Sequence, residues 1–221
     1  MKKLFLCMLL ICGFCVVAVS DVSAYEFTFQ KLEQNTSLSG SQFTGVLDGN
    51  DEVVSFVFSN SGPYASRIKA VYFDDQLDLL DGIAELTTGA SVNFEGQEDA
   101  GNLPGGQNMV PPFPRKADFY AKVDGGAALG VDPGESLRIL FDLGDEATLD
   151  ALVKALVGEE LRIGIHVGSI DRRLVAPDGS DSDSFYAVPG NPVPEPATML
   201  LFGSGLMGLA AFGRKKFFKR S

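Results

Sequence analysis

Hydrophobic and polar side chains alternate along most of the chain between residues 25 and 188. Tyr25, Phe27 and Phe29 alternate with polar neighbours, whereas residues 53–58 carry apolar side chains on both faces, as in a strand that is buried on both sides. Further strands are predicted over residues 68–73, 90–94, 119–123, 137–143, 161–167 and 184–188. Glycine, asparagine, aspartate and proline residues separate these segments and favour turns. About eight short strands in this span predict a mainly β body, an antiparallel β-sandwich over residues 25–188.

One segment departs from this alternation and has the spacing of an amphipathic helix. Apolar residues recur between Leu149 and Leu156 at the intervals of one helical face. We expect Asp145 to cap the N-terminus of this helix and Gly158 to end it. Its apolar stripe is expected to pack against an edge or an open end of the sandwich. A second candidate helix covers residues 75–86.

Residues 100–116 form a long segment that is rich in glycine and proline and follows neither period. Loops of this length without secondary structure are usually either functional or disordered. The segment is expected to bring Met109 and Phe113 toward the surface, and it ends in the basic pair Arg115 and Lys116. A ligand-contacting loop is one interpretation, and a poorly ordered surface loop is the favoured one.

The N-terminus has the layout of a secretory signal peptide. Two lysines precede an apolar run over residues 4–19, and small or modest side chains follow it. We predict that residues 1–24 are removed by a signal peptidase that cuts between Ala24 and Tyr25. The alternative is an uncleaved anchor, which the short apolar run and the cleavable segment after it disfavour.

The C-terminus consists of three parts. Residues 189–196 form a proline-rich linker, residues 197–213 carry no charge, and residues 214–221 are strongly basic. As a helix, the uncharged part spans roughly 26 Å, near the lower limit for a transmembrane helix. The basic tail then predicts a cytoplasmic C-terminus and a body outside the membrane. A signal peptide requires the same topology, so the two ends of the chain agree.

The order of motifs at this end resembles a known sorting signal. Pro194, Glu195 and Pro196, followed by a short glycine-bearing apolar helix and a basic cluster that begins at Arg214, look like the PEP-CTERM signal of Gram-negative bacteria. The resemblance implies recognition by an exosortase, an integral membrane transpeptidase that processes its substrates near the Pro-Glu-Pro motif. It also implies an association with exopolysaccharide production and biofilm matrix. Segments of the body, such as residues 161–167, resemble a body that recurs among such proteins without an assigned activity.

Charge and cysteine content exclude several kinds of partner and site. The chain has a net charge of −11 from 18 basic and 29 acidic side chains, yet both ends are basic, so the body is more acidic than the whole. Such a body repels nucleic acid and anionic lipid. Cys7, Cys12 and Cys15 all lie in the predicted signal peptide, so the body has neither a disulfide framework nor a thiol nucleophile.

Candidate catalytic residues are scarce in the body. The single histidine, His166, falls with Arg162 on the face of its predicted strand that points away from the core. No Gly-x-Ser-x-Gly motif and no body cysteine supplies a nucleophile beside it. Acidic residues are plentiful, but glycosidase clefts usually add aromatic platforms, and the chain has no tryptophan. We therefore predict no catalytic residues and no enzyme activity, with a secreted hydrolase as the least favoured alternative.

Clustered aspartates are the candidate ligands for a metal ion. Asp178, Asp181 and Asp183 lie in a turn-rich segment, and a second group lies between Asp74 and Asp81. Calcium prefers several oxygen ligands from a flexible loop, which either group offers in part. Neither group matches an EF-hand loop or a glycine-rich nonapeptide repeat. An acidic solvated surface is the favoured interpretation, so no cofactor is predicted and calcium stays an alternative.

These features together predict an exported protein. Its body passes into the periplasm while the C-terminal helix holds it in the inner membrane, and it ends at the cell surface or in the extracellular matrix. A structural or adhesive role linked to exopolysaccharide and biofilm is the favoured function, with a carbohydrate- or calcium-binding module as the alternative. The expected partners are the signal peptidase, an exosortase, the inner membrane and exopolysaccharide.

Overall fold

The computed structural model describes residues 24–87, 91–126 and 128–190. Both residues of the predicted signal cleavage site, Ala24 and Tyr25, are among them. The rest of the predicted signal peptide and the predicted membrane helix lie outside the described residues. Within the described ranges, no helix has the length and apolar character needed to cross a membrane.

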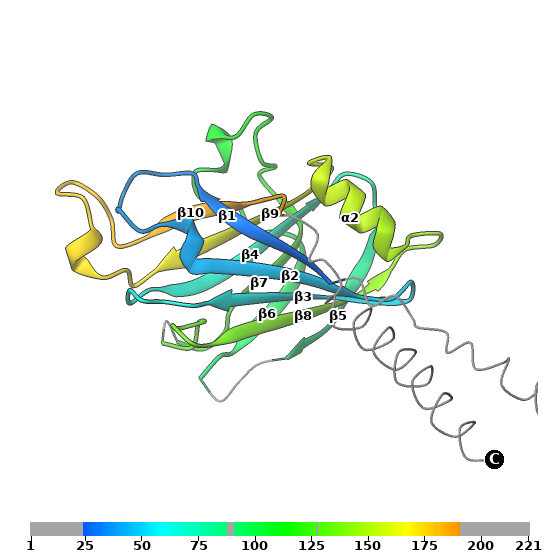
Figure 1. Cartoon of the computed structure of the whole chain (residues 1–221), viewed down its shortest axis with the longest axis horizontal. Helices are drawn as coiled ribbons and strands as arrows, with labels where there is room; N and C mark the ends of the chain where they lie inside the picture. Colours follow the sequence, from blue (N-terminus) through cyan, green and yellow to red (C-terminus); the bar gives the residue numbers. More distant parts are fainter. Residues whose placement is uncertain (1–23, 88–90, 127, 191–221) are drawn as a thin grey trace, which may run out of the picture.

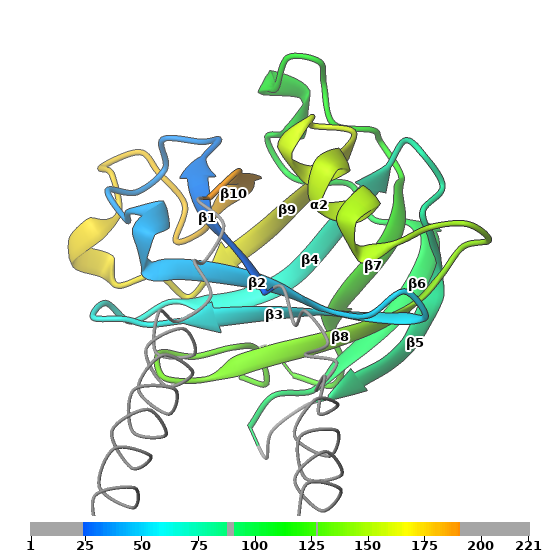
Figure 2. The ribbon, with the colours of Figure 1, turned by 45° about the vertical axis from the view of Figure 1, so that its right-hand side comes forward.

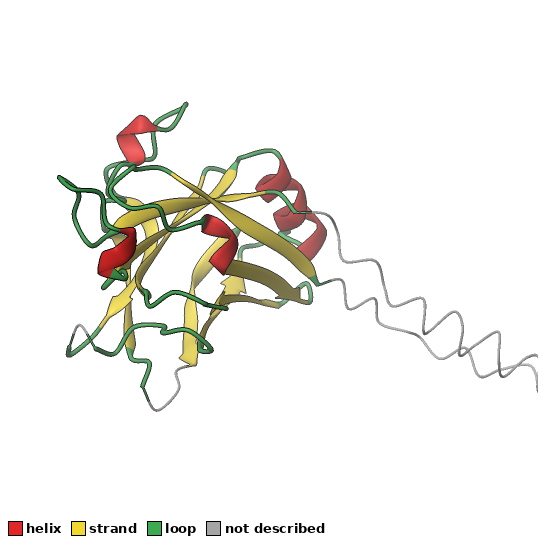
Figure 3. Cartoon of the chain, turned by 60° about the vertical axis from the view of Figure 1, so that its left-hand side comes forward, coloured by secondary structure: helices red, strands yellow, loops and turns green. Residues whose placement is uncertain are grey.

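Strands make up most of the body, and the helical segments lie at its periphery (Figures 1 and 3). The strands are β1 (Tyr25–Lys31), β2 (Phe43–Gly49), β3 (Val53–Asn60), β4 (Arg67–Asp75), β5 (Leu80–Thr87), β6 (Phe94–Ala100), β7 (Ala117–Val123), β8 (Ser136–Leu143), β9 (Leu161–Gly168) and β10 (Asp183–Val188). The helical segments are the α-helix α2 (Leu149–Val157) and the 3-10 turns η1 (Gly40–Gln42), η2 (Gly106–Asn108) and η3 (Arg172–Leu174).

All ten strands belong to one antiparallel sheet in the order β5-β8-β3-β2-β1-β10-β9-β4-β7-β6. The sheet curls until its two edge strands, β5 and β6, approach each other, so that the body is nearly a barrel (Figure 2). A side chain in place of Gly96 on β6 would have its Cβ 3.0 Å from Ile83 Cδ1 on β5, which shows how closely the edges meet. The prediction of a mainly β, antiparallel body is confirmed. The prediction of a sandwich of about eight strands is wrong, because ten strands form a single rolled sheet.

Strand β2 was missed because a glycine interrupts its hydrophobic pattern. Phe43 and Leu47 point inward, but the inward position between them is Gly45. A Cβ at Gly45 would lie 2.1 Å from the ring of Phe27 on the neighbouring strand β1, so Phe27 fills this space instead. The predicted strand at 90–94 is also displaced, since β6 begins only at Phe94.

The second candidate helix, residues 75–86, is wrong, because most of this segment forms strand β5. Leu80, Ile83 and Leu86 are spaced by three residues, which suits a helical face. In β5, two irregularities in the pairing with β8, between Leu80 and Gly82 and between Ile83 and Glu85, add one residue each. Each bulge shifts the alternation, so all three apolar side chains meet the core from a strand.

Phenylalanine side chains from strands all around the sheet fill the interior. Phe56 lies edge-on to Phe73 with ring centroids 5.1 Å apart, and Phe73 lies edge-on to Phe141 at 4.9 Å. Phe119 extends this chain of contacts at 5.2 Å from Phe141. Such edge-to-face pairs add to the stabilisation from apolar burial. The interior is therefore a packed core rather than a ligand channel.

Helix α2 contacts β2 and β9 and lies across one end of the rolled sheet (Figure 2). Its buried side chains, among them Leu149, Leu152 and Leu156, join the main core, which confirms the predicted packing. Gly158 ends the helix as predicted, but Thr148 rather than Asp145 is the N-cap, since the Thr148 side chain accepts a hydrogen bond from the backbone N–H of Ala151. The predicted cap lies three residues too early.

The two ends of the body lie side by side. The Tyr25 hydroxyl donates a hydrogen bond of 2.8 Å to the carbonyl oxygen of Gly190. A Cβ at Gly190 would lie only 2.0 Å from the carbonyl oxygen of Glu26, so the chain leaving β10 presses directly against β1. Segments that precede Tyr25 and follow Gly190 therefore start from the same part of the body.

Candidate functional site

The outer face of β9, β4 and β7 is partly covered by residues 101–116, which are the predicted loop 100–116 without Ala100, the last residue of β6. Leu103 and Phe113 from this loop are buried with Ala70, Tyr72 and Ala117 in a second apolar cluster outside the sheet. The backbone of Gly164 on β9 makes room for this cover, because a Cβ there would lie 2.5 Å from Leu103. The prediction that the loop brings Phe113 to the surface is wrong, since Phe113 is only 5% exposed.

An ion pair on the same outer face holds the loop in place. Arg162 of β9 pairs with Asp74 of β4, at 2.6 Å between Nε and Oδ2, and each side chain is only 9% exposed. The Arg162 guanidinium also donates to the carbonyl oxygens of Pro111 and Pro112 and lies over the ring of Phe113 at 5.4 Å. Arg162 points away from the main core as predicted, but it fastens the loop rather than meeting solvent.

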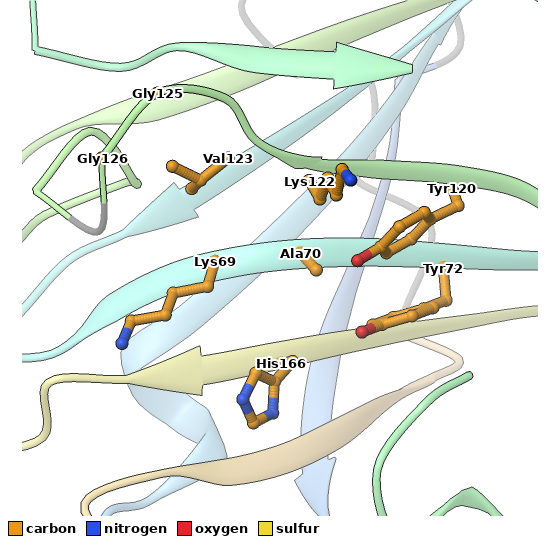
Figure 4. Close-up of a pocket in the computed structure, with 9 residues that line it drawn as sticks. All are labelled: Lys69, Ala70, Tyr72, Tyr120, Lys122, Val123, Gly125, Gly126 and His166. Carbon is orange, nitrogen blue, oxygen red and sulfur yellow. The ribbon is translucent and has the colours of Figure 1, made fainter. Parts of the chain in front are cut away.

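A shallow, open hollow of about 320 Å³, lined by polar and apolar groups, lies on the part of this face that the loop leaves open. Figure 4 shows its lining, which consists of Lys69, Ala70, Tyr72, Tyr120, Lys122, Val123, Gly125, Gly126 and His166. The strand register explains why these side chains meet. Ala70 of β4 pairs with His166 of β9 on one side and with Lys122 of β7 on the other. The small Ala70 side chain is therefore the floor between a histidine and a lysine.

Lys69 comes into the hollow through a bulge. The pairing of β4 with β9 shifts between Ile68 and Ala70, so Lys69 is the extra residue. Ile68 is fully buried in the main core, whereas Ala70 belongs to the outer cluster. A regular strand would place both on one face, so the bulge reverses the alternation at Lys69 and adds this side chain to the outer face.

Two tyrosines form one wall of the hollow. Tyr72 and Tyr120 are stacked with ring centroids 4.8 Å apart and planes at 28°, and the hydroxyl groups of both point toward the side of Lys69 and His166 (Figure 4). Gly101, at φ +79°, lies against the ring of Tyr120, where a Cβ would approach ring atoms at 2.7 Å. Burial, and secondarily the neighbouring Tyr120 hydroxyl, raises the pKa of Tyr72. The pair offers neutral hydroxyl groups and ring edges rather than open aromatic faces.

His166 is half-buried at the bottom of the hollow. Its Nδ1 lies 3.2 Å from the hydroxyl oxygen of Ser184 on β10. Burial lowers the pKa of His166, and the positive charge of Lys69 lowers it further, while Asp183 acts in the opposite direction. The imidazole is therefore neutral at pH 7. The predicted orientation of His166, away from the main core, is confirmed.

The hollow carries positive charge on an acidic body. Lys122 forms an ion pair of 2.9 Å with Glu95, in which both side chains are substantially exposed. Lys69 has no ion-pair partner within 4.0 Å among the described residues. With one unpaired lysine, one exchangeable pair and a neutral histidine, the hollow presents donors to an anionic group.

The calcium candidates do not come together. Asp183 is fully buried, and its carboxylate accepts hydrogen bonds from the backbone N–H groups of Asn35 at 3.1 Å and Thr36 at 3.0 Å. It also lies 3.4 Å from Lys31 Nζ. Asp178 and Asp181 are exposed on the preceding turn. In the described part of the chain, no three acidic, histidine or cysteine side chains are grouped so that they could hold a metal ion.

In the second acidic group, between Asp74 and Asp81, the two buried carboxylates already have other partners. Asp74 pairs with Arg162, and Asp75 accepts a hydrogen bond of 2.8 Å from the backbone N–H of Leu80. Asp78 and Asp81 are exposed.

Sequence reasoning missed the hollow itself. His166 was singled out, but Lys69, Tyr72, Tyr120 and Lys122 were not, because they belong to β4 and β7, whose pairing is set by the order of the strands. The available signal was weak: the two predicted strands each carry a tyrosine and a lysine among apolar residues.

Comparison with known proteins supports the sorting motif predicted at the C-terminus. Residues 192–216 match the model of the PEP-CTERM protein-sorting motif. This range includes the predicted motif residues Pro194, Glu195, Pro196 and Arg214, which lie outside the described residues, and the prediction of a PEP-CTERM sorting motif is confirmed. The motif is that of an exported exosortase substrate that passes through the membrane before cleavage. No curated protein and no solved structure matches the chain.

Proposed function

Because the chain carries a PEP-CTERM sorting motif, we propose that it is an exosortase-processed protein of the cell surface or extracellular matrix, with a structural or adhesive role linked to exopolysaccharide. The single observation that carries this proposal is the match over residues 192–216. In this role the body binds other matrix components without catalysing a reaction, and the C-terminus carries the sorting signal. Signal peptidase and exosortase are the two processing partners.

The arrangement of the chain ends supports such a transit. Tyr25 and Gly190 are joined by a hydrogen bond, so the predicted signal peptide and the C-terminal segment leave the body together. A folded body held in this way is compatible with an inner-membrane intermediate whose body faces the periplasm. An intact-mass measurement of the protein recovered from the matrix is expected to give Tyr25 as the first residue and to lack the basic tail.

A binding role is favoured over catalysis by the chemistry of the hollow. His166 has a hydroxyl partner in Ser184, but Ser184 is fully buried at 0% exposure and cannot meet a bulky substrate. A general base without an accessible protein nucleophile gives little support to covalent hydrolysis. A secreted hydrolase thus stays the least favoured alternative.

The sorting proposal is tested by changing the motif in the full-length protein in its own cells. Replacing Pro194, Glu195 and Pro196 together by alanine is expected to stop processing, so that the protein stays in the membrane fraction with its basic tail attached. Pro189→Ala, in the same linker but outside residues 192–216, is the matched control and is expected to be processed normally. Unchanged processing and location of the triple variant would contradict the proposal.

Calcium binding at Asp178, Asp181 and Asp183 stays the alternative to a body without a cofactor, and it can be tested directly. A ligand that binds only the native state raises its melting temperature. A rise in melting temperature with millimolar calcium, and its loss in Asp181→Asn, is the expected result if this turn binds calcium. An unchanged melting temperature would count against it.

A further inference from the structure

We propose that the hollow on β9, β4 and β7 binds a hydroxyl-rich carboxylate, such as a uronate residue of an acidic polysaccharide. Lys69 and Lys122 attract the carboxylate, Tyr120 and His166 hydrogen-bond to the sugar hydroxyl groups, and the buried Tyr72 supports the Tyr120 ring from behind. The inference rests on the proposed adhesive role and names its ligand class. The sorting motif says nothing about ligand binding by the body, so this site is additional to it.

The charge of the hollow selects an anion. The body as a whole is acidic and repels anions, so a ligand of this charge needs a local concentration of cations. Lys69 supplies a cation without an ion-pair partner among the described residues. The side chains of Lys122 and Glu95 are 38% and 43% exposed, and a pair so exposed contributes little and exchanges readily for another carboxylate.

The neutral groups of the hollow select a ligand with hydroxyl groups. A phenol and a neutral imidazole each donate and accept hydrogen bonds, which matches an alcohol better than it matches a bare anion. Figure 4 shows both tyrosine hydroxyls on the same side of the hollow as Lys69 and His166. A volume of about 320 Å³ exceeds what an inorganic anion fills and lies within the range of small-molecule sites.

The walls of the hollow are held in place before any ligand arrives. Tyr72 is only 4% exposed and is packed in the outer cluster, and Tyr120 is confined between the Tyr72 ring and the backbone of Gly101. The ion pair of Arg162 with Asp74 fastens the loop that completes this cluster. A site with fixed walls loses little conformational entropy on binding.

The test measures binding by the purified full-length protein in detergent. Affinity electrophoresis with polygalacturonate, neutral dextran and inorganic phosphate as separate probes distinguishes the ligand classes. Retardation by polygalacturonate but not by dextran is expected, with phosphate acting only as a weak competitor. Equal retardation by dextran would overturn the assignment to a sugar carboxylate. So would phosphate that abolishes the retardation when its concentration only equals that of the uronate groups.

Variants locate the binding in the hollow. Lys69→Met is expected to weaken binding to polygalacturonate by roughly tenfold, the effect of losing a hydrogen bond to a charged group. Tyr120→Phe keeps the stacked ring and is expected to weaken binding by about fivefold with an unchanged melting temperature. Lys154→Met removes the same charge from the exposed face of α2 and is the matched control.

If Lys154→Met weakens binding as much as Lys69→Met, retention reflects overall charge and the proposal is wrong. Full retention by both Lys69→Met and Tyr120→Phe would also overturn it. The sorting test reads the location of the protein in cells, and this test reads binding in solution. A failure of either is therefore distinguishable from a failure of the other.

Discussion

Asp75 is the least satisfied polar side chain among the described residues. It is 3% exposed at the end of β4, where its Oδ2 accepts a hydrogen bond of 2.8 Å from the backbone N–H of Leu80. Its Oδ1 is buried and has no hydrogen-bond partner in the described part of the chain. Burial raises the pKa of Asp75, backbone hydrogen bonds from the turn up to Leu80 offset part of this rise, and the nearby carboxylate of Asp118 adds to it. The ionised form is therefore unfavourable in the folded protein.

Asp75→Asn is expected to stabilise the protein at pH 7, because asparagine keeps an acceptor for Leu80 and carries no charge. The pKa of Asp75 is higher in the folded than in the unfolded protein. The free energy of unfolding therefore falls as the pH rises from the unfolded-state pKa through the folded-state pKa. Below the unfolded pKa of about 3.9, both states are protonated and the cost disappears. We expect a gain of about 1 kcal/mol at pH 7, or roughly 2–4 °C in melting temperature, that shrinks below pH 4.

Asp74 provides a control, because the same substitution there is expected to destabilise the protein. Asp74→Asn leaves the buried guanidinium of Arg162 without its counter-charge, and we expect a loss of about 3 kcal/mol at pH 7. Thermal unfolding of both variants across pH 3–8 makes the comparison. A loss of stability in Asp75→Asn at pH 7, parallel to that of Asp74→Asn, would contradict the account given for Asp75.

At the scale of elements, β1, β3 and β9 were predictable from their alternation, whereas β2 and β5 were not. β1, β3 and β9 were predicted because each places an apolar side chain at every second position against the core. β2 lacks one of these side chains at Gly45, and β5 shifts its alternation at two bulges. In both cases the missing information is a contact with another strand, which local sequence does not contain.

In the candidate site, too, features set by regular alternation were predictable and features set by contacts between strands were not. The outward direction of His166 was predicted from the period of β9, since a regular strand fixes its two faces. The position of Lys69 was not predictable, because the bulge beside it depends on the pairing of β4 with β9. The sorting motif needed no tertiary contact: Pro194-Glu195-Pro196, the apolar segment and the basic cluster from Arg214 were recognised from their order alone, and the family match covers residues 192–216.

The packing of the loop against the outer face makes the protein sensitive to a methyl group added at Gly164. In Gly164→Ala, the added Cβ would lie 2.5 Å from Leu103, so the loop must move away from the sheet. We expect a destabilisation of about 1–3 kcal/mol and faster cleavage by trypsin after Arg115 and Lys116. Gly126→Ala is the matched control, because nothing lies within 4 Å of the added Cβ. Equal trypsin cleavage rates for both variants would show that Leu103 does not hold the loop.

The N-terminus of α2 predicts which of two residues caps it. The Thr148 hydroxyl accepts a hydrogen bond of 3.1 Å from the backbone N–H of Ala151, whereas Asp145 is exposed three residues earlier. Thr148→Ala is expected to cost about 1 kcal/mol of unfolding free energy. Asp145→Ala is expected to change it by less than about 0.5 kcal/mol. Denaturant unfolding measures both, and the reverse order would return the cap to Asp145.

At the scale of the whole molecule, the rolled sheet leaves two edges that must not pair with other copies. β5 and β6 are the ends of the strand order and do not pair with each other in the sheet. A groove of about 430 Å³ separates them and is lined by Glu85 and Glu98 among others. Charged side chains along an exposed edge oppose pairing with another edge. The two bulges of β5 disturb its ladder further.

Removing the charge from these edges is expected to make the protein associate with itself. Glu85→Gln combined with Glu98→Gln keeps the size of both side chains while it removes the repulsion between two acidic edges. Light scattering at low salt is expected to show a rise in mass with protein concentration for this double variant and a monomer for the unchanged protein. High salt should narrow the difference, because it screens exposed charges.

Glu159→Gln combined with Glu160→Gln, a change of equal charge beyond the C-terminus of α2, is the control. Association of both double variants would attribute the effect to net charge rather than to the edges, whereas association of the edge variant alone ties the monomeric state to the open seam of the sheet.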